Sequence, residues 1–327
     1  METAQEKAAA AIRLLGGNVE IDEEAPGGPV VFVDLGGQPE AADAAVPHLP
    51  TFTELRWLSL ADTRFTDSGA RCLQGLTELR HLDLGGTEIT DAGLANLTRL
   101  SQLQFIGLAC TKVTGGGLEH LQGLNRLREL VLQGTRISGA GLKHLTSLGD
   151  ILVLNLAGSP LTDEGFAHIR DLTQIWTLDI SATQVGDAGL HNLKKLKKLL
   201  GLDLAGTALT DAGLEHLQRL TLLHQLNLGA TRVTDAGLER LKRLTQLQKL
   251  DLHDTRVTDA GLLHLQGLTQ LQRLDLQNTQ ISDAGLPRLR DFRRLRELDL
   301  AGTRVSQAAA VELRAALPKV RIGTTAG

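Results

Sequence analysis

An unbroken 24-residue repeat constrains this chain more than any other feature of its sequence. A hydroxyl residue recurs at every twenty-fourth position over eleven units, with no insertion. The equivalent positions are Thr63, Thr87, Thr111, Thr135, Ser159, Thr183, Thr207, Thr231, Thr255, Thr279 and Thr303. A register kept over so many units predicts a repeat protein, in which each unit packs mainly on its two neighbours.

Each repeat changes its hydrophobic period in the middle. The unit reads L-x-x-L-x-L-x-x-T-x-[IV]-T-D-A-G-L-x-x-L-x-x-L. In the first part Leu82 and Leu84 flank a polar residue, and this period of two predicts a strand whose leucines face inward. In the second part Leu214, Leu217 and Leu220 stand three apart, which predicts one face of a short helix.

The leucines of one unit cannot be buried without a neighbouring unit. Stacking the units would bury them as one core, and this core must be aliphatic because aromatic residues make up only 2% of the chain. The strand side is narrower than the helix side, so the stack must curve. We therefore expect an α/β solenoid in the form of a curved horseshoe, with a parallel sheet on the concave face and short helices on the convex face.

The two ends depart from the repeat, as the ends of a solenoid must. Residues 1–54 predict an N-terminal cap made of a helix, a β-hairpin and an irregular helix, and residues 55–308 hold the eleven repeats. Ala309 and Ala310 replace the recurrent Gly and Leu, so residues 309–327 predict a C-terminal cap and tail.

Three residue types recur where each strand gives way to a helix. The T-D pair, which includes Asp91, is expected to cap free N–H groups of the helix and to oppose its dipole. A Gly inside the first helical turn, as at Gly117, costs about 1 kcal/mol relative to Ala and predicts that backbone passes close to backbone. The recurrent hydroxyl, as in Thr87, is expected to hydrogen-bond turn backbone.

The unit resembles leucine-rich repeats over about residues 30–322. Its T-D-A-G-L motif is similar to the cysteine-containing subtype in F-box/leucine-rich-repeat proteins, and more similar still to bacterial proteins that repeat T-D-A-G-L. That subtype usually has Cys or Asn where this chain has Thr or Ser. The resemblance implies a binding fold with many unrelated partners, and we expect no F-box before the repeats.

Motifs of catalysis and cofactor binding are not found in the sequence. It holds no GxSxG, GxxxxGK[ST] or HExxH pattern, so we expect neither an enzyme nor a cofactor. Neighbouring helices about 10 Å apart cannot share a zinc ion, whose bonds to His are about 2 Å long. We therefore expect no metal site at five histidines of one helix position, which we interpret as exposed: His120, His144, His168, His216 and His264.

Charge and cysteine content limit the partners and the compartment. The net charge of −4 argues against nucleic acid, which needs a basic field. No stretch is apolar for long enough to cross a bilayer, and the acidic N-terminus is unlike a secretory signal. Cys72 and Cys110 are compatible with free thiols in a reducing compartment. We expect a monomeric, cytoplasmic protein whose partner is another protein.

Large side chains at strand positions are the first candidates for a binding surface. Trp57, His81 and Phe105 occupy the same outward position in three consecutive repeats, and Trp is a preferred interface anchor. Trp176 lies one position earlier in its own repeat, at the edge of this face, with a Leu at that position in the repeat on either side. Each cluster is compatible with a binding patch or with local packing. As a binding patch we favour Trp57, His81 and Phe105, because they lie squarely on the inner face.

Acidic side chains are the second candidates. The position between the paired leucines carries Asp in most C-terminal repeats, including Asp251, Asp275 and Asp299. Carboxylates about 4.8 Å apart repel each other, so a basic segment of a partner or a cation would stabilise them. The alternative is that these are solvated side chains whose repulsion is screened by salt.

These features favour a non-catalytic protein-interaction scaffold that binds its partner on the concave face. The aromatic cluster would anchor the partner, and the row of Asp residues would favour basic segments. The alternative is a substrate-recognition subunit of a ubiquitin-ligase-like complex, or a secreted effector, which would need a second docking surface.

Overall fold

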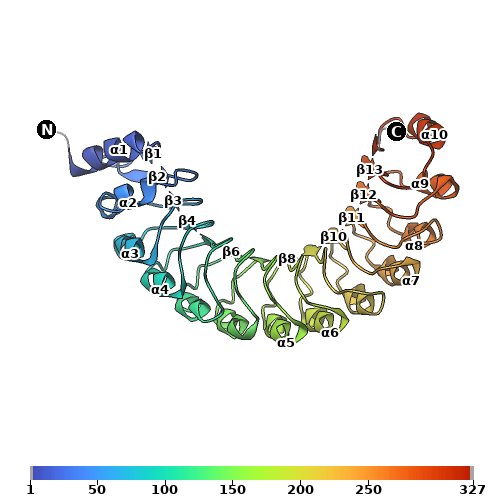
Figure 1. The fold of residues 1–327 in the computed structure, drawn as a ribbon, viewed down its shortest axis with the longest axis horizontal. Helices are drawn as coiled ribbons and strands as arrows, with labels where there is room; N and C mark the ends of the chain where they lie inside the picture. Colours follow the sequence, from blue (N-terminus) through green and yellow to red (C-terminus); the bar gives the residue numbers. More distant parts are fainter. Residues whose placement is uncertain (1–2, 325–327) are drawn as a thin grey trace. The chain divides into compact units, whose positions relative to one another are not determined.

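The chain forms two compact units, Met1–Pro160 and Leu161–Gly327 (Figure 1). The computed structural model describes residues 3–324. Within each unit the strands line the concave side and the short helices cover the convex side, as the repeat pattern predicts. This confirms the expected leucine-rich-repeat solenoid architecture.

The sheet of the first unit begins with an antiparallel hairpin and continues with parallel strands. Strands β1 and β2 pair antiparallel, and each later strand of the unit pairs parallel with the one before it. Equivalent positions of the repeats are register partners, so one strand position forms one row across the sheet. The strands are β1 (Asn18–Ile21), β2 (Val30–Asp34), β3 (Trp57–Ser59), β4 (His81–Asp83), β5 (Phe105–Gly107), β6 (Glu129–Val131) and β7 (Val153–Asn155).

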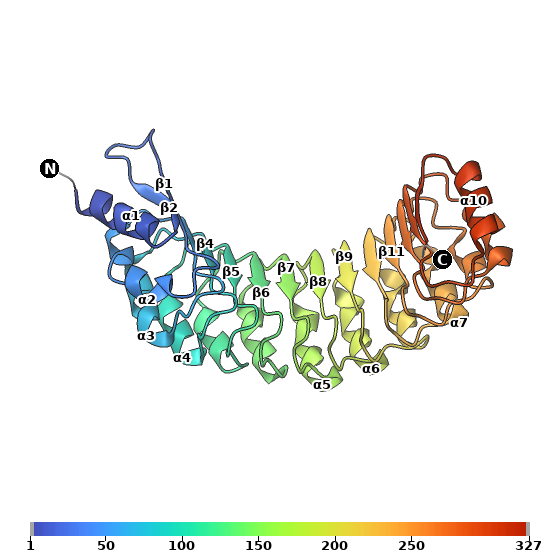
Figure 2. The same ribbon diagram turned by 45° about the horizontal axis from the view of Figure 1, so that its top comes forward.

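The helices of the first unit lie on the side of its sheet opposite to the strands' outward row (Figure 2). They are α1 (Ala4–Leu14), α2 (Ala41–Ala45), η1 (Leu49–Thr51), α3 (Asp67–Ala70), η2 (Arg71–Gly75), α4 (Asp91–Leu94), η3 (Ala95–Leu97), η4 (Gly117–Leu121) and η5 (Ala140–Ser147), where η marks a 3₁₀ helix. Helix α1 and the hairpin of β1 and β2 lie in the segment from which the sequence predicts an N-terminal cap.

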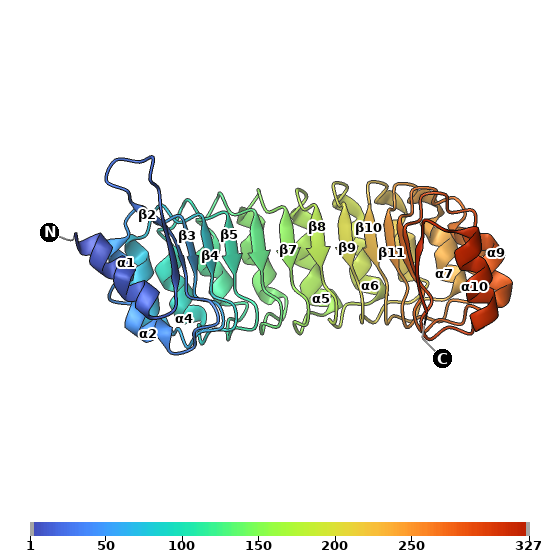
Figure 3. The same ribbon diagram turned by 90° about the horizontal axis from the view of Figure 1, so that it is seen from above.

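The second unit repeats the same arrangement with parallel strands only. Its strands lie side by side, and α10, which lies between β13 and β14 in the chain, is near the C-terminal end of the unit (Figure 3). The strands are β8 (Thr177–Asp179), β9 (Gly201–Asp203), β10 (Gln225–Asn227), β11 (Lys249–Asp251), β12 (Arg273–Asp275), β13 (Glu297–Asp299) and β14 (Arg321–Gly323). The helices are α5 (Asp163–Phe166), η6 (Ala167–Asp171), α6 (Asp187–Leu190), η7 (His191–Lys195), η8 (Gly213–Arg219), α7 (Asp235–Leu238), η9 (Glu239–Arg243), α8 (Leu262–Leu265), η10 (Asp283–Gly285), α9 (Leu286–Leu289) and α10 (Gln307–Ala316). Of the predicted C-terminal tail, residues 325–327 lie outside the described residues.

The core of each unit is aliphatic, and the recurrent hydroxyls are buried in it. The strand residues Leu58, Leu82 and Ile106 are fully buried. Thr87 donates its hydroxyl hydrogen to the carbonyl of Leu84 at 2.6 Å, and the same bond recurs in the other repeats. The predicted hydrogen bond to turn backbone is thus confirmed, and it satisfies a polar group that would be costly to bury alone.

Much of the convex side is 3₁₀ helix rather than α-helix. The segment that carries Leu214 and Leu217 is η8, a 3₁₀ helix. Because a 3₁₀ helix has three residues per turn, leucines spaced three apart stand directly above one another on its buried side. The strict spacing of three therefore selects the tighter helix, a distinction that the prediction of a short helix did not make.

The Asp of each T-D pair contacts the next repeat instead of only capping its own helix. Asp91 accepts hydrogen bonds from the backbone N–H of Thr114 at 2.8 Å and from its hydroxyl at 2.6 Å. We call this arrangement the Asp–Thr pair. It recurs at Asp67–Thr90, Asp187–Thr210, Asp211–Thr234 and Asp235–Thr258, and with Ser at Asp259–Ser282 and Asp283–Ser306.

The recurrent Gly makes room for this Asp, which corrects the prediction of a close backbone approach. A Cβ atom at Gly117 would lie 2.5 Å from Oδ1 of Asp91, too close for any side chain. A Cβ atom at Gly141 would meet backbone instead, because Gly115 replaces the Asp of the preceding repeat. The glycines beside an Asp therefore permit hydrogen bonds between repeats, and the energy of those bonds offsets the cost of Gly in a helix.

Candidate functional site

Four aromatic rings form one continuous stack on the strand side of the first unit. Ring centroids lie 5.8 Å apart between Phe32 and Trp57, 3.2 Å between Trp57 and His81, and 4.0 Å between His81 and Phe105. The interplanar angles are 22°, 3° and 6°, so the rings are nearly parallel. We call these four residues the aromatic ladder.

The strand register produces the ladder. Phe32, Trp57, His81 and Phe105 are direct register partners on β2, β3, β4 and β5. Alternation along each strand points these side chains away from the core, and 40% of the surface of Trp57 is exposed. The structure thus brings together the three aromatic residues that the sequence singled out, stacked on one another and still accessible to solvent.

Stacking decides which parts of the rings a partner can reach. The faces of the two inner rings, Trp57 and His81, are covered by their neighbours, so these rings present their edges to solvent. A ring edge carries partial positive charge and packs well against apolar groups and aromatic faces. The faces, which carry partial negative charge, are uncovered by other rings only at the ends, on Phe32 and Phe105.

The imidazole of His81 belongs to the ladder in its neutral form. Burial between the neighbouring rings lowers the pKa of His81 to about 4. The ladder therefore carries no charge of its own near neutral pH, and protonation in acid would introduce a cation into a partly desolvated stack.

Phe32 was not among the predicted site residues. It belongs to the hairpin of the cap and precedes Trp57 by 25 residues instead of 24. Counting in steps of 24 therefore misses it, although the parallel pairing of β2 with β3 places it in the same row.

Trp176 lies in the second unit, directly before β8. Its side chain is 47% exposed, and its backbone carbonyl accepts a hydrogen bond from the N–H of Leu200 at 2.7 Å. Three consecutive repeats have a large side chain at this strand edge: Leu152, Trp176 and Leu200. Leu152 belongs to the first unit, and Trp176 and Leu200 belong to the second. Trp176 is thus an exposed aromatic outside the ladder.

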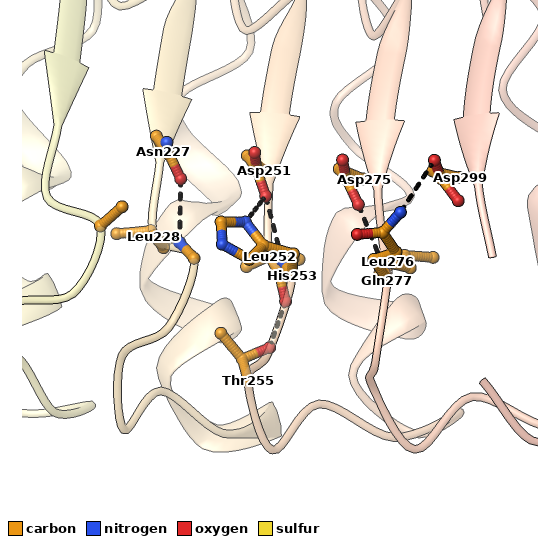
Figure 4. Close-up of polar contacts among 12 residues, drawn as sticks. Asn227, Leu228, Asp251, Leu252, His253, Thr255, Asp275, Leu276, Gln277 and Asp299 are labelled. Carbon is orange, nitrogen blue, oxygen red and sulfur yellow. Dashed lines mark hydrogen bonds and ion pairs between the residues drawn. The ribbon is translucent and has the colours of Figure 1, made fainter. Parts of the chain in front are cut away.

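The last residues of six strands in the second unit form a row that is mostly acidic, which we call the acidic row. It consists of Asp179, Asp203, Asn227, Asp251, Asp275 and Asp299, which are register partners on β8 to β13. In each of them Oδ1 accepts the backbone N–H two residues further on, at 2.9–3.0 Å. Figure 4 shows this bond at Asn227, Asp251 and Asp275. One oxygen of each predicted acidic site residue therefore shapes a turn.

The carboxylates of the row are neighbours across the sheet, because their residues are register partners on adjacent strands. Burial raises the pKa of Asp203 and of Asp275, and the flanking carboxylates raise it further. Only some of the second oxygens have partners within the row, such as Oδ2 of Asp203, which accepts from Nδ2 of Asn227 at 2.9 Å. The charges of neighbouring carboxylates thus contribute to the raised pKa of Asp203 and of Asp275.

His253 is a further polar residue beside this row, and it was not among the predicted site residues. Its Nδ1 donates to Oδ1 of Asp251 at 2.7 Å (Figure 4). Burial lowers the pKa of His253, but the hydrogen bond and charge of Asp251 outweigh burial and raise it above its ordinary value. The ring of His253 occupies the space that a side chain at position 229 would fill. The glycine at position 229 was the only sign in the sequence that the ring of His253 lies there.

A shallow hollow of about 380 Å³ opens on the strand face of the second unit. Gly201 contributes no side chain there, and Asp203, Asn227 and Lys249 line the hollow.

No group of three or more His, Cys, Asp or Glu side chains within residues 3–324 is placed to hold a metal ion. The recurrent helix histidines are only half-exposed, which corrects their interpretation as exposed residues.

Comparison with known proteins identifies the family. The model of the leucine-rich repeat region family matches residues 38–321, so the chain belongs to that family. An internalin from Listeria monocytogenes has a similar structure, with a TM-score of 0.68 and 21% identity over 100% of this chain and 98% of that one. A leucine-rich-repeat protein of Leptospira interrogans gives a TM-score of 0.51 and 18% identity over 84% and 85% of the two chains. At these identities the likeness establishes the fold alone.

Two further findings bear on the sequence. No curated protein matches it significantly. Among the helices of the described part of the chain, none combines the length and the apolar character that crossing a membrane requires.

Proposed function

We propose that this protein is a non-catalytic scaffold that binds a partner protein on the strand face of its repeats, with the aromatic ladder as the anchor. The observation that carries this proposal is the continuous, partly exposed stack of Phe32, Trp57, His81 and Phe105. A contiguous exposed patch of large apolar side chains is typical of an interface, and Trp dominates many interface energies. Membership of the leucine-rich repeat family supports a protein-binding role.

The rigidity of the ladder also supports an interface. Each ring is held by its neighbours and by a strand fixed in the sheet, so little conformational entropy is lost when a partner binds. In contrast, a catalytic role would need a nucleophile or an acid–base pair beside a reacting group, and the imidazole of His81 is instead stacked between two aromatic rings.

We propose the acidic row of the second unit as a secondary contact for basic segments of a partner. Burial, and after it the charge of the flanking carboxylates, raises the pKa of Asp203 and Asp275, and a positive charge beside them would stabilise both carboxylates. In Asp251 and Asp275 the first oxygen holds the turn and the second would receive the basic side chain. In Asp299 the second oxygen also accepts from Nε2 of Gln277 at 3.3 Å, so a partner would compete with that amide.

Several finer properties are proposals of the same kind. We propose residues 55–308 as the repeat body between the two caps, and a repeat subtype close to that of F-box/leucine-rich-repeat proteins, supported by the T-D-A-G-L motif. We also propose a monomeric, cytoplasmic protein; the free thiols of Cys72 and Cys110 support the cytoplasmic location.

Capture of the partner from native cells tests the proposal. The purified chain is crosslinked to its partners, and Trp57→Ala/Phe105→Ala is compared with the native protein. Loss of a hot-spot aromatic costs about 2 kcal/mol or more, so we expect at least a thirtyfold loss of affinity. Asp251→Lys/Asp275→Lys should weaken capture less.

The matched control is Leu263→Ala, which removes an equally exposed apolar side chain from the convex side. Circular dichroism and thermal unfolding confirm that each variant is folded. If the Trp57→Ala/Phe105→Ala protein captures the same partner as the native chain, the ladder is not the binding surface.

A further inference from the structure

Both ends of the aromatic ladder face a glutamate on the next strand. At one end, Glu20 on β1 is the direct register partner of Phe32. At the other end, Glu129 on β6 is the register partner of Phe105. The row across the first unit therefore runs carboxylate, four rings, carboxylate. Because the ring faces are free of other rings only at these two ends, each free face has a carboxylate about one strand spacing away, roughly 4.8 Å.

The two glutamates are available to a partner. Glu20 is exposed and Glu129 is half-buried, and neither forms an ion pair with any residue in the described range 3–324. Arg56, the nearest arginine in sequence to Trp57, is bound to Asp22 at 3.2 Å.

The remaining basic side chains near the ladder lie outside its row. Arg80 and Arg128 each stand one residue before a ladder-row position, and alternation along a strand directs them away from that row. The row itself is thus apolar in the middle and negative at both ends.

A carboxylate next to a free aromatic face is suited to one kind of group, a cation. An Arg or Lys side chain that reaches over this end of the row can contact the negative face of the ring and pair with the adjacent carboxylate. The ring edges between the two ends accept apolar side chains. Resting on the proposed function of the ladder, we propose that its partner is an extended segment with two basic side chains on either side of an apolar stretch.

The spacing of the two basic residues follows from the sheet. The two cation positions, between β1 and β2 and between β5 and β6, are four strand spacings apart, about 19 Å. An extended chain rises about 3.3 Å per residue, so two side chains six residues apart are about 20 Å apart and point the same way. The partner segment therefore carries its basic residues at positions i and i+6, with apolar residues at i+2 and i+4.

A synthetic peptide of sequence RSLSLSR is the probe. It is titrated into full-length protein that carries Trp176→Phe, so that the fluorescence reports Trp57 alone. Each end combines one cation–π contact with one exposed ion pair. Glu20→Gln/Glu129→Gln removes the two ion pairs and leaves the rings, so it should reduce affinity by roughly fivefold. The peptide ESLSLSE should not bind, and RSLSR, which reaches only one end, should bind about fivefold more weakly than RSLSLSR.

The matched control is Glu78→Gln/Glu119→Gln, which removes the same charge from other surfaces of the same unit and should leave the affinity unchanged. An effect of this control equal to that of Glu20→Gln/Glu129→Gln would overturn the proposal, as would a failure of the native protein to bind RSLSLSR.

The two proposals fail in different ways. If Phe105→Ala abolishes peptide binding while Glu20→Gln/Glu129→Gln has no effect, the charged ends play no part but the ladder remains a binding surface. If Phe105→Ala also leaves both peptide binding and partner capture unchanged, the proposed function itself is wrong.

Discussion

Replacing Gly117 with Ala should destabilise the first unit, although Ala is ordinarily the better residue in a helix. The substitution gains at most about 1 kcal/mol of helix propensity. However, the new Cβ would lie 2.5 Å from Oδ1 of Asp91, so the carboxylate must leave Thr114. Its two hydrogen bonds, at 2.8 and 2.6 Å, are charge-assisted and together contribute about 2–3 kcal/mol. We expect a net loss of about 1–2 kcal/mol.

A double-mutant cycle separates this mechanism from general strain. Asp91→Ala alone should cost about 2–3 kcal/mol, because it removes the same two hydrogen bonds. Once the carboxylate is gone, Gly117→Ala meets only Cδ1 of Leu94 at 3.0 Å, a flexible side-chain end. The double variant should therefore be about as stable as Asp91→Ala, with a coupling energy of about 2 kcal/mol between the two positions.

The assay is equilibrium unfolding in urea, monitored by the fluorescence of Trp57 in a Trp176→Phe background. Trp57 lies in the same unit as both substitutions, so its signal reports the relevant transition. Additive costs, within about 0.5 kcal/mol, would show that Gly117 and Asp91 do not compete for the same space, and would refute this account of the recurrent glycine.

Three further predictions concern titratable groups. The pKa of His81 is lowered to about 4 in the folded state, so the unfolded chain binds more protons than the folded chain between pH 6.5 and 4. The free energy of unfolding should therefore decrease as the pH falls through that window. In His81→Phe the melting temperature should decrease less over the same window. Burial raises the pKa of Cys72 to about 12, so at pH 8 iodoacetamide should modify the exposed Cys110 first in native protein, and equal labelling by mass spectrometry would contradict this. Asp275→Asn keeps the oxygen that accepts the N–H of Gln277 and removes one charge from the acidic row, so it should raise the melting temperature at pH 7 and low salt, with a smaller gain at high salt.

The sequence determines the sheet and its rows because both follow from local periodicity. The alternation of Leu82 and Leu84 fixes which side chains point outward, and the constant repeat length fixes which of them become neighbours. Trp57, His81 and Phe105 could therefore be placed in one row from the repeat length alone. The same row continues to Glu129, which the count of 24 also reaches but which attracted no attention beside three aromatic residues.

Contacts that depend on side-chain conformation could not be predicted in this way. The sequence shows that Asp91 begins a helix, but not that its carboxylate turns to Thr114 of the next repeat. Phe32 was not predicted because it lies in the hairpin of the cap, 25 residues before Trp57 and not 24. The turn bonds of the acidic row were equally hidden, since Asp251 in a strand pattern gives no sign that one of its oxygens holds the backbone N–H of His253.

The most direct test of a binding role for the ladder is site-specific photo-crosslinking in native cells. A benzophenone amino acid replaces Trp57 in one variant and the exposed Glu119 on the helix side of the same unit in another. We predict that the probe at position 57 captures one protein partner and that the probe at position 119 does not. Capture of that partner from position 119, with none from position 57, would contradict the account.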